Sequence, residues 1–157
     1  MKINSGNLTT EKQNPNSMDI DTISTREILE LINKEDSYIP SVIKKVIPEI
    51  EKTVGFTLNA LKKGNRVIYI GAGTSGRLGI LDASEIPPTF SAPREWFTGV
   101  IAGGREAVFR SIEAAEDIPE NSQKDLDAIG LQNGDVVIGI ASSSTTPYVI
   151  AGLRYGK

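Results

Sequence analysis

The chain of 157 residues carries 17 Lys and Arg against 20 Asp and Glu, a net charge of −3, and contains neither His nor Cys. This length suits one domain with a substantial core, and the charge balance argues against a nucleic-acid partner. Without Cys or His there is no disulfide, no thiolate nucleophile and no common transition-metal ligand, so we expect no metal and assign acid–base chemistry to Asp, Glu, Lys or Tyr.

The first 22 residues are polar and include the turn signal Asn14-Pro15-Asn16-Ser17, so we expect a flexible N-terminal arm. The arm lacks the apolar core of a signal peptide, and no apolar run approaches the roughly 18 residues that span a bilayer. The sequence therefore predicts a cytoplasmic protein without a membrane partner.

Helical spacing follows the arm. Ser24 and Glu27 form a capping box ahead of an apolar stripe, which predicts a short helix over residues 25–33. A longer helical pattern covers residues 40–64 with Pro48 in its interior. Because proline removes a backbone donor, we expect a bend there or two abutting helices.

A glycine-rich turn then follows a short apolar run. Residues 67–70 are apolar and β-prone, and they predict a buried parallel strand. Residues 71–76, GAGTSG, combine glycines that tolerate positive φ or close backbone approach with the hydroxyls of Thr74 and Ser75 at a helix start. We interpret Gly73, Thr74 and Ser75 as part of an anion-binding cradle.

The same glycines match the GxGxxG fingerprint of dinucleotide-binding folds. That fingerprint places an acidic residue at the end of the next strand, but the next predicted strand, residues 96–102, ends in Gly103-Gly104. Glu95 has the right sequence distance but precedes that strand. We therefore favour a phosphosugar or similar small phosphate, with a dinucleotide or a structural turn as alternatives.

Two helices are predicted around the second strand. The first begins near Leu78 and cannot continue regularly through Pro87-Pro88, which places Glu85 near its end. The second covers residues 107–115 and is ended by Pro119, soon after Glu116. A further short helix is predicted over residues 125–131. On spacing alone, a surface charge is the favoured interpretation of Glu85, and a solvated face that of Glu116 with its acidic neighbours.

A second loop has the same design as the first. Residues 136–141 predict a third buried strand, and a helix opens at Pro147. Between them lie the hydroxyls of Ser142, Ser143 and Thr146. Parallel crossover connections put both loops at one edge of the sheet, where their helix N-termini can converge on one anion. An ordinary helix cap is the alternative for this loop.

The predicted fold is therefore α/β, an open doubly wound parallel sheet of which the chain carries the N-terminal portion, preceded by helices. We expect a flexible arm over residues 1–22, helices over residues 23–64 and the phosphosugar-binding domain over residues 65–157.

With these segments placed, the chain resembles the N-acetylmuramic acid 6-phosphate etherases of the sugar isomerase (SIS) superfamily. The motifs STREILELINKED, IYIGAGTSGRLGILDASEIPPTF, IAGG, EAAED and GDVVIGIASSSTTPYVIAGL carry the resemblance over nearly all of residues 8–157. It implies the first half of a longer, homodimeric enzyme that needs no cofactor or metal. It further implies release of D-lactate from N-acetylmuramic acid 6-phosphate by elimination and then hydration, leaving N-acetylglucosamine 6-phosphate during cell-wall recycling.

The resemblance also implies roles for single residues. Glu85 in DASE and Glu116 in EAAED match the catalytic glutamates of the family, while Ser143 and Thr146 match hydroxyls expected to bind phosphate. Ser144 and Thr145 stand where the family commonly has Gly-Arg, and the glycine position is one that would need positive φ. The alternative function is that of a relative that senses phosphosugars and regulates a partner protein without turnover.

Overall fold

The computed structural model describes residues 8–157, so the part of the expected arm over residues 1–7 lies outside the described residues. The chain divides into two compact units, Met1–Gly55 and Phe56–Lys157.

The first unit is helical. It contains the 3₁₀ turns η2 (Thr9–Glu11) and η3 (Pro15–Ser17), then α1 (Thr25–Asp36), α2 (Ile39–Lys45) and the start of α3 (Ile47–Lys62). The capping box between Ser24 and Glu27 is present, as the sequence predicted. The expectation at Pro48 is also confirmed, because α2 ends at Lys45 and α3 starts at Ile47, one residue before that proline. The segment before α1 is tied to it, since Asn14 and Asn16 donate hydrogen bonds of 2.7 and 2.9 Å to Glu35.

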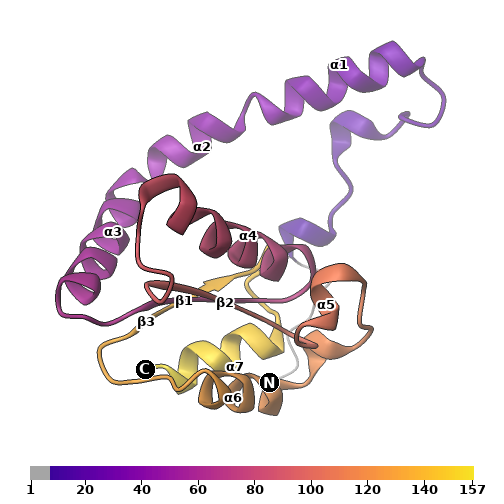
Figure 1. The fold of residues 1–157 in the computed structure, drawn as a ribbon. Coiled ribbons are helices and arrows are strands. Elements are labelled where there is room, and N and C mark those ends of the chain that lie inside the picture. Colours follow the sequence, from indigo (N-terminus) through magenta and orange to yellow (C-terminus); the bar gives the residue numbers. More distant parts are fainter. Residues whose placement is uncertain (1–7) are drawn as a thin grey trace. The chain divides into compact units, whose positions relative to one another are not determined.

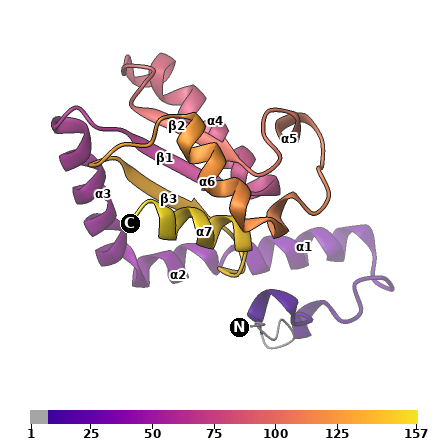
Figure 2. The same ribbon diagram turned by 90° about the horizontal axis from the view of Figure 1, so that it is seen from below.

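The second unit is built on three parallel strands, β1 (Val67–Gly71), β2 (Phe97–Ile101) and β3 (Val136–Ile140). Their order is β2-β1-β3, so the first strand is central (Figures 1 and 2). The three strands are in step: Val67 lies opposite both Phe97 and Val136, and Gly71 lies opposite both Ile101 and Ile140. The predicted open parallel α/β sheet is therefore observed.

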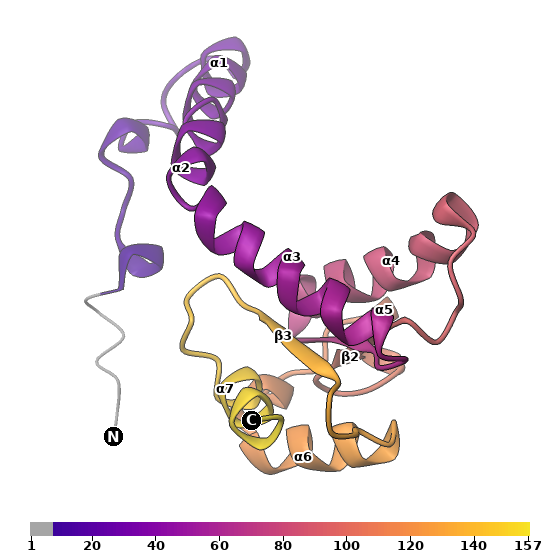
Figure 3. The same cartoon turned by 90° about the vertical axis from the view of Figure 1, so that its left-hand side faces the viewer.

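Helices cover both faces of this sheet. The helix α4 (Gly73–Phe90) lies on one face, while α6 (Pro119–Ala128) and α7 (Pro147–Tyr155) lie together on the other (Figures 2 and 3). The short α5 (Glu106–Phe109) and the 3₁₀ turn η4 (Ala115–Asp117) lie in the connection from β2 to α6. The buried core fills the space between the sheet and α6 and α7; it comprises Ile68, Ile70, Val100, Ala102, Leu126, Tyr148 and Val149.

The amino-terminal edge of the sheet is closed by one ion pair. The guanidinium of Arg66 lies 2.7 Å from the carboxylate of Asp135, whose side chain is only 2% exposed. The same guanidinium donates to the carbonyls of Ile129 and Gly130 at 3.0 and 2.6 Å, and the Arg66 N–H donates to Asp135 at 2.8 Å. These bonds join the start of β1 to the turn that precedes β3.

The helix α4 is longer than the sequence indicated, because it continues through Pro87 and Pro88 to Phe90. The prolines occupy the last turn, so they remove only the N–H groups that would pair with the carbonyls of Ala83 and Ser84. Both residues line an open hollow of about 660 Å³ at this end of the helix. Glu85 therefore lies within a continuous helix.

The predicted helix over residues 107–115 is wrong. Only α5 forms, and Arg110 after it is extended (φ −146°, ψ 161°). Arg77 of α4 donates to the carbonyls of Val108 and Arg110, which a continuing helix would have offered to its own N–H groups. Pro119 likewise opens α6 at its first position, where a missing N–H costs nothing, although we expected it to end a helix.

None of the helices in the described part of the chain combines the length and the apolar character that a bilayer-spanning segment requires.

Candidate functional site

Two loops leave the carboxyl edge of the sheet side by side. The loop into α4 follows Gly71 of β1, and the loop into α7 follows Ile140 of β3. Gly71 and Ile140 are partners in the register of neighbouring strands. Figure 1 shows α4 and α7 starting at this same end of the sheet, one on each side of it. The geometry required for two loops to face one ligand is therefore present.

The first loop is shaped by its glycines. The strand end and the helix touch so closely that a Cβ on Gly71 would lie 2.6 Å from the backbone nitrogen of Gly76. Gly73 opens α4 with φ 53°, in the left-handed region that favours glycine. The residue before it, Ala72, is the N-cap and supplies no side-chain acceptor. The N–H groups of the first turn therefore keep the capacity to bind an anion, with Thr74 exposed and Ser75 half-buried beside them.

The second loop is bonded to itself. The Ser143 and Thr145 hydroxyls lie 2.7 Å apart, and the Thr145 N–H donates to Ser143 Oγ at 3.4 Å. Ser144 between them has φ 57°, which confirms that this position needs a positive φ. Thr146 occupies the N-cap position of α7, but its side chain makes no hydrogen bond to the helix. Ser142 is exposed, whereas Ser143 and Thr146 are half-buried.

The helix behind the second loop is firmly anchored. Tyr148, in the first turn of α7, is fully buried, and its hydroxyl donates a 2.6 Å hydrogen bond to Asp125 of α6. Burial, with the hydrogen bond to Asp125 and its charge, raises the pKa of Tyr148 far above its ordinary value, so the hydroxyl remains a donor. The start of α7 is therefore fixed against α6.

Glu116 lies beside the first loop. It belongs to η4, which follows Ala114 in a left-handed conformation (φ 58°). Glu116, Gly73, Arg77 and Glu113 line one hollow of about 130 Å³ at the carboxyl edge of the sheet. The sequence placed Glu116 at the end of a helix, but the irregular connection brings it next to the candidate cradle.

Arg77 is the residue whose role the sequence left undecided. Its Nε donates to the carbonyl of Val108 at 3.0 Å, and its Nη2 donates to the carbonyl of Arg110 at 3.1 Å. The side chain therefore joins the second turn of α4 to the end of α5. In the sequence, only the closeness of this arginine to the glycine turn indicated that Arg77 has a role at the site.

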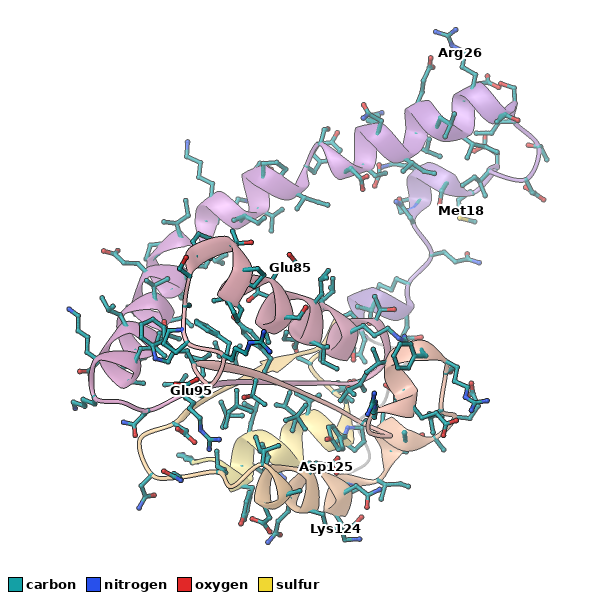
Figure 4. The ribbon with its side chains drawn as sticks, viewed as in Figure 1. Met18, Arg26, Glu85, Glu95, Lys124 and Asp125 are labelled. Atoms are coloured by element: carbon teal, nitrogen blue, oxygen red, sulfur yellow. The ribbon has the colours of Figure 1, made fainter. Side chains whose placement is uncertain are left out.

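Glu85 is not brought to this hollow by its own chain. It lies ten residues beyond Ser75 in α4, which at 1.5 Å per residue is about 15 Å along the helix. Its side chain is exposed on the part of α4 labelled in Figure 4. The two predicted catalytic glutamates therefore lie on different parts of this unit.

The arrangement offers chemistry for a phosphorylated ligand. Two helix starts without side-chain caps and several hydroxyls can donate hydrogen bonds to a phosphate, and Glu116 lines the hollow next to the first of these helix starts. Within residues 8–157, the acidic side chains form no cluster that could hold a metal ion.

Comparison with known proteins finds related sequences over nearly the whole chain. Residues 49–157 match the family described as the glucokinase regulatory protein N-terminal SIS domain. A protein named N-acetylmuramic acid 6-phosphate etherase from Glaesserella parasuis serovar 5 (strain SH0165) is 51% identical over 97% of this chain and 50% of its own length.

Similar proteins come from other bacteria. N-acetylmuramic acid 6-phosphate etherase 2 of Vibrio parahaemolyticus serotype O3:K6 (strain RIMD 2210633) is 50% identical over all of this chain and 52% of its own length. The protein named N-acetylmuramic acid 6-phosphate etherase from Rhizobium rhizogenes (strain K84 / ATCC BAA-868) is 55% identical over 96% of this chain and 49% of its own. The chain spans about half the length of the curated relatives it matches.

Proposed function

The chain belongs to the SIS domain family, and from this premise we propose that the whole protein cleaves the D-lactyl ether of N-acetylmuramic acid 6-phosphate. The products are D-lactate and N-acetylglucosamine 6-phosphate. The observation that supports this most is the shared sheet edge, where the loops after β1 and β3 lie side by side and Glu116 lines the hollow next to Gly73. The names of relatives at 50–55% identity support the same substrate.

In this proposal the sugar phosphate binds between the two loops. The N–H groups at the start of α4, with the hydroxyls of Thr74 and Ser75, donate to phosphate oxygens from one side. Ser142, Ser143 and Thr146 donate from the other. A charge-assisted hydrogen bond contributes about 1.5–3 kcal/mol, so several of them can hold a dianion without a lysine.

The reaction proceeds from the open-chain aldehyde of the sugar. A base removes the proton on C2, the bond between C3 and the lactyl oxygen breaks, and an acid protonates that oxygen, so that D-lactate leaves. Water then adds across the C2–C3 double bond of the unsaturated aldehyde, which places a hydroxyl on C3 and returns a proton to C2. The base and the acid are Glu116 and Glu85, and each positioned group contributes about 10² to 10⁴ in rate.

Glu85 reaches the reaction from a second copy of the chain. A separation of about 15 Å along α4 is too long for its own side chain to span, whereas an exposed carboxylate can enter the site of a partner. A homodimer is consistent with large apolar side chains exposed in the first unit, among them Leu29, Ile32, Val42 and Ile43. The proposal also assigns the protein to the cytoplasm, as a step of peptidoglycan recycling.

Lactate release by the full-length protein tests the proposal, with Glu85→Gln compared with Glu95→Gln. Glu95 is an exposed acidic residue just before β2 and serves as a matched loss of charge (Figure 4). We expect turnover to fall about 10²-fold or more with Glu85→Gln and to stay unchanged with Glu95→Gln. Equal turnover by all three proteins would remove Glu85 from the mechanism.

The two-copy arrangement has its own test. Glu85→Gln and Glu116→Gln proteins, each inactive alone, are unfolded together and refolded as a mixture. If each site takes one glutamate from each copy, half of the dimers are mixed and one site in each is intact, so about a quarter of wild-type turnover returns. No recovery in a mixture shown to contain mixed dimers would place both glutamates in one subunit.

A regulatory function is the second candidate, because the matching family is described by the name of a regulatory protein. A sensor needs the hydroxyl loops but no acid–base pair. Binding of N-acetylglucosamine 6-phosphate by a full-length protein that releases no lactate would favour the sensor. Lactate release that depends on Glu85 and Glu116 would exclude it.

A further inference from the structure

One cationic side chain connects the two parts of the candidate site. The guanidinium of Arg77 donates to the carbonyls of Val108 and Arg110 at 3.0 and 3.1 Å. Because α5 has only four residues, the carbonyls at its end have no N–H partner within a continuing helix. Arg77 therefore caps α5 from a neighbouring helix and fixes the point at which the chain leaves it.

That point begins the irregular segment which carries Glu116. The chain is extended at Arg110, turns through Ala114 with positive φ, and reaches Glu116 in η4. Regular structure returns only at Pro119, the first residue of α6. The position of Glu116 thus depends on α6 at one end of the segment and on Arg77 at the other, while its neighbour Ala115 packs against the core and η4 contacts α7.

The two ends of Arg77 touch opposite parts of the site. Its backbone belongs to α4, whose first residue is Gly73, and its guanidinium holds the segment that leads to Glu116. Arg77, Gly73 and Glu116 all line the hollow of about 130 Å³. A movement of the guanidinium would therefore change the separation between the phosphate cradle and the carboxylate.

We propose that Arg77 is a positioning residue, which sets the distance between Glu116 and the cradle by holding the backbone of Val108 and Arg110. It acts on the rate of the chemical step and leaves phosphate affinity to the loops. The inference rests on the proposed function for its kinetic consequence, while the tie itself can be tested without any turnover.

The kinetic test compares Arg77→Met, Arg77→Lys and Arg110→Gln in the full-length protein with N-acetylmuramic acid 6-phosphate. Arg110→Gln is the matched control, because it removes an exposed charge that pairs with Glu106 and keeps the carbonyl that Arg77 holds. We expect Arg77→Met to lower kcat about 10²-fold with KM unchanged, since a misplacement of about 1 Å can cost this much. Arg77→Lys can reach only one carbonyl, so its kcat should lie between those of Arg77→Met and the wild type. Arg110→Gln should have the kcat of the wild type.

The second test is amide hydrogen exchange in the same proteins without substrate. Arg77→Met should speed exchange in residues 110–117 while exchange in β1 and β3 stays at the wild-type rate. This arm separates the two proposals: a wild type that releases no lactate fails the proposed function, yet local exchange still reports on the tie. If Arg77→Met does not fold, Arg77→Lys supplies both readouts.

Three results would overturn the inference. A rise in KM, or weaker binding of N-acetylglucosamine 6-phosphate, with kcat unchanged would make Arg77 a phosphate ligand. Faster exchange throughout the second unit would make it a general support of the fold. Wild-type kinetics and wild-type exchange in Arg77→Met would leave it without either role.

Discussion

The two edges of the same three-stranded sheet are built in opposite ways. At the amino edge, Arg66 and Asp135 form an ion pair with a nearly fully buried carboxylate, and the guanidinium also satisfies two carbonyls. At the carboxyl edge, the start of α4 has no side-chain cap, and two non-glycine residues, Ala114 and Ser144, take left-handed conformations. A third such residue, Ser91, follows the other end of α4 as its C-cap.

This difference separates stability from function. Groups that satisfy one another contribute to folding and have nothing left to bind, whereas open donors and strained backbone are frequent at sites that bind a ligand. Changes at the carboxyl edge should therefore act mainly on turnover, with only small effects on unfolding where backbone strain is relieved or introduced, and changes at the amino edge should act on unfolding. Substitutions at each edge test that separation.

The largest expected effect is at Glu116. Glu116→Gln should lower kcat about 10²- to 10⁴-fold, because it removes an acid–base group of the proposed mechanism. It should leave the unfolding midpoint unchanged, because the side chain is exposed. Lactate release and urea unfolding measure the two quantities. Asp117→Asn is the control. It removes the same charge one residue further along the chain, and the side chain of Asp117 does not line the hollow.

The reverse outcome is expected at the amino edge. Asp135→Ala should lower the free energy of unfolding by about 3 kcal/mol, because it leaves a partly buried guanidinium without its carboxylate. Turnover per folded molecule should not change. Glu30→Ala breaks the exposed pair with Arg26 and should cost only about 0.3–0.5 kcal/mol. Equal losses of unfolding free energy in the two variants would mean that the buried pair contributes no more to stability than the exposed one.

The same pair predicts a pH dependence. Burial alone would raise the pKa of Asp135, but hydrogen bonds from Arg66 and the Gln132 N–H, with the charge of Arg66, outweigh it and hold that pKa below its ordinary value of 3.8. Because the pKa of Asp135 is lower in the folded state, its ionised form stabilises the fold fully at pH values above the unfolded-state pKa. This contribution is lost as the pH falls through the folded-state pKa. Wild-type stability should therefore drop below about pH 4, and Asp135→Ala should show a smaller drop.

A smaller effect separates the two loops of the carboxyl edge. Ser75 has an open helix start beside it, whereas the hydroxyl of Ser143 is already bonded to that of Thr145. Ser75→Ala should weaken binding of N-acetylglucosamine 6-phosphate by about 1.5–3 kcal/mol. Ser143→Ala should cost less, because binding must first break the bond within the loop. Calorimetry measures both, and a larger loss at Ser143 would contradict this ranking.

Much of the fold followed from local patterns. The capping box at Ser24, the break near Pro48 and the strands were predicted because each depends on residues that are close together in sequence. The placement of both loops at one edge also followed, since parallel connections of this kind leave few alternatives.

The errors arose where distant residues compete with local preference. The pattern over residues 107–115 is helical, but Arg77 takes two of the carbonyls that the helix would need. A proline alone does not predict whether a helix begins, continues or ends at it: Pro119 opens a helix and Pro87 lies inside one. The surroundings of Glu116 could not be predicted for the same reason, because they depend on how α4 and α5 meet.

The smallest expected effect tests backbone strain at the carboxyl edge. Ser144 holds φ 57° at a cost of about 1–2 kcal/mol for a residue with a Cβ. Glycine removes that cost but loses about 0.5–1 kcal/mol through the greater freedom of the unfolded chain, so Ser144→Gly should raise the free energy of unfolding by about 0.5 kcal/mol.

Gly73→Ala is the matched reverse change. Its φ is 53°, and nothing lies within 4 Å of the added Cβ, so only the backbone cost is introduced. Urea unfolding should therefore move in opposite directions in the two variants. If Ser144→Gly destabilises the protein instead, the bond between Ser143 and Thr145 contributes more than the strain costs, and the second loop is preorganised as firmly as the first.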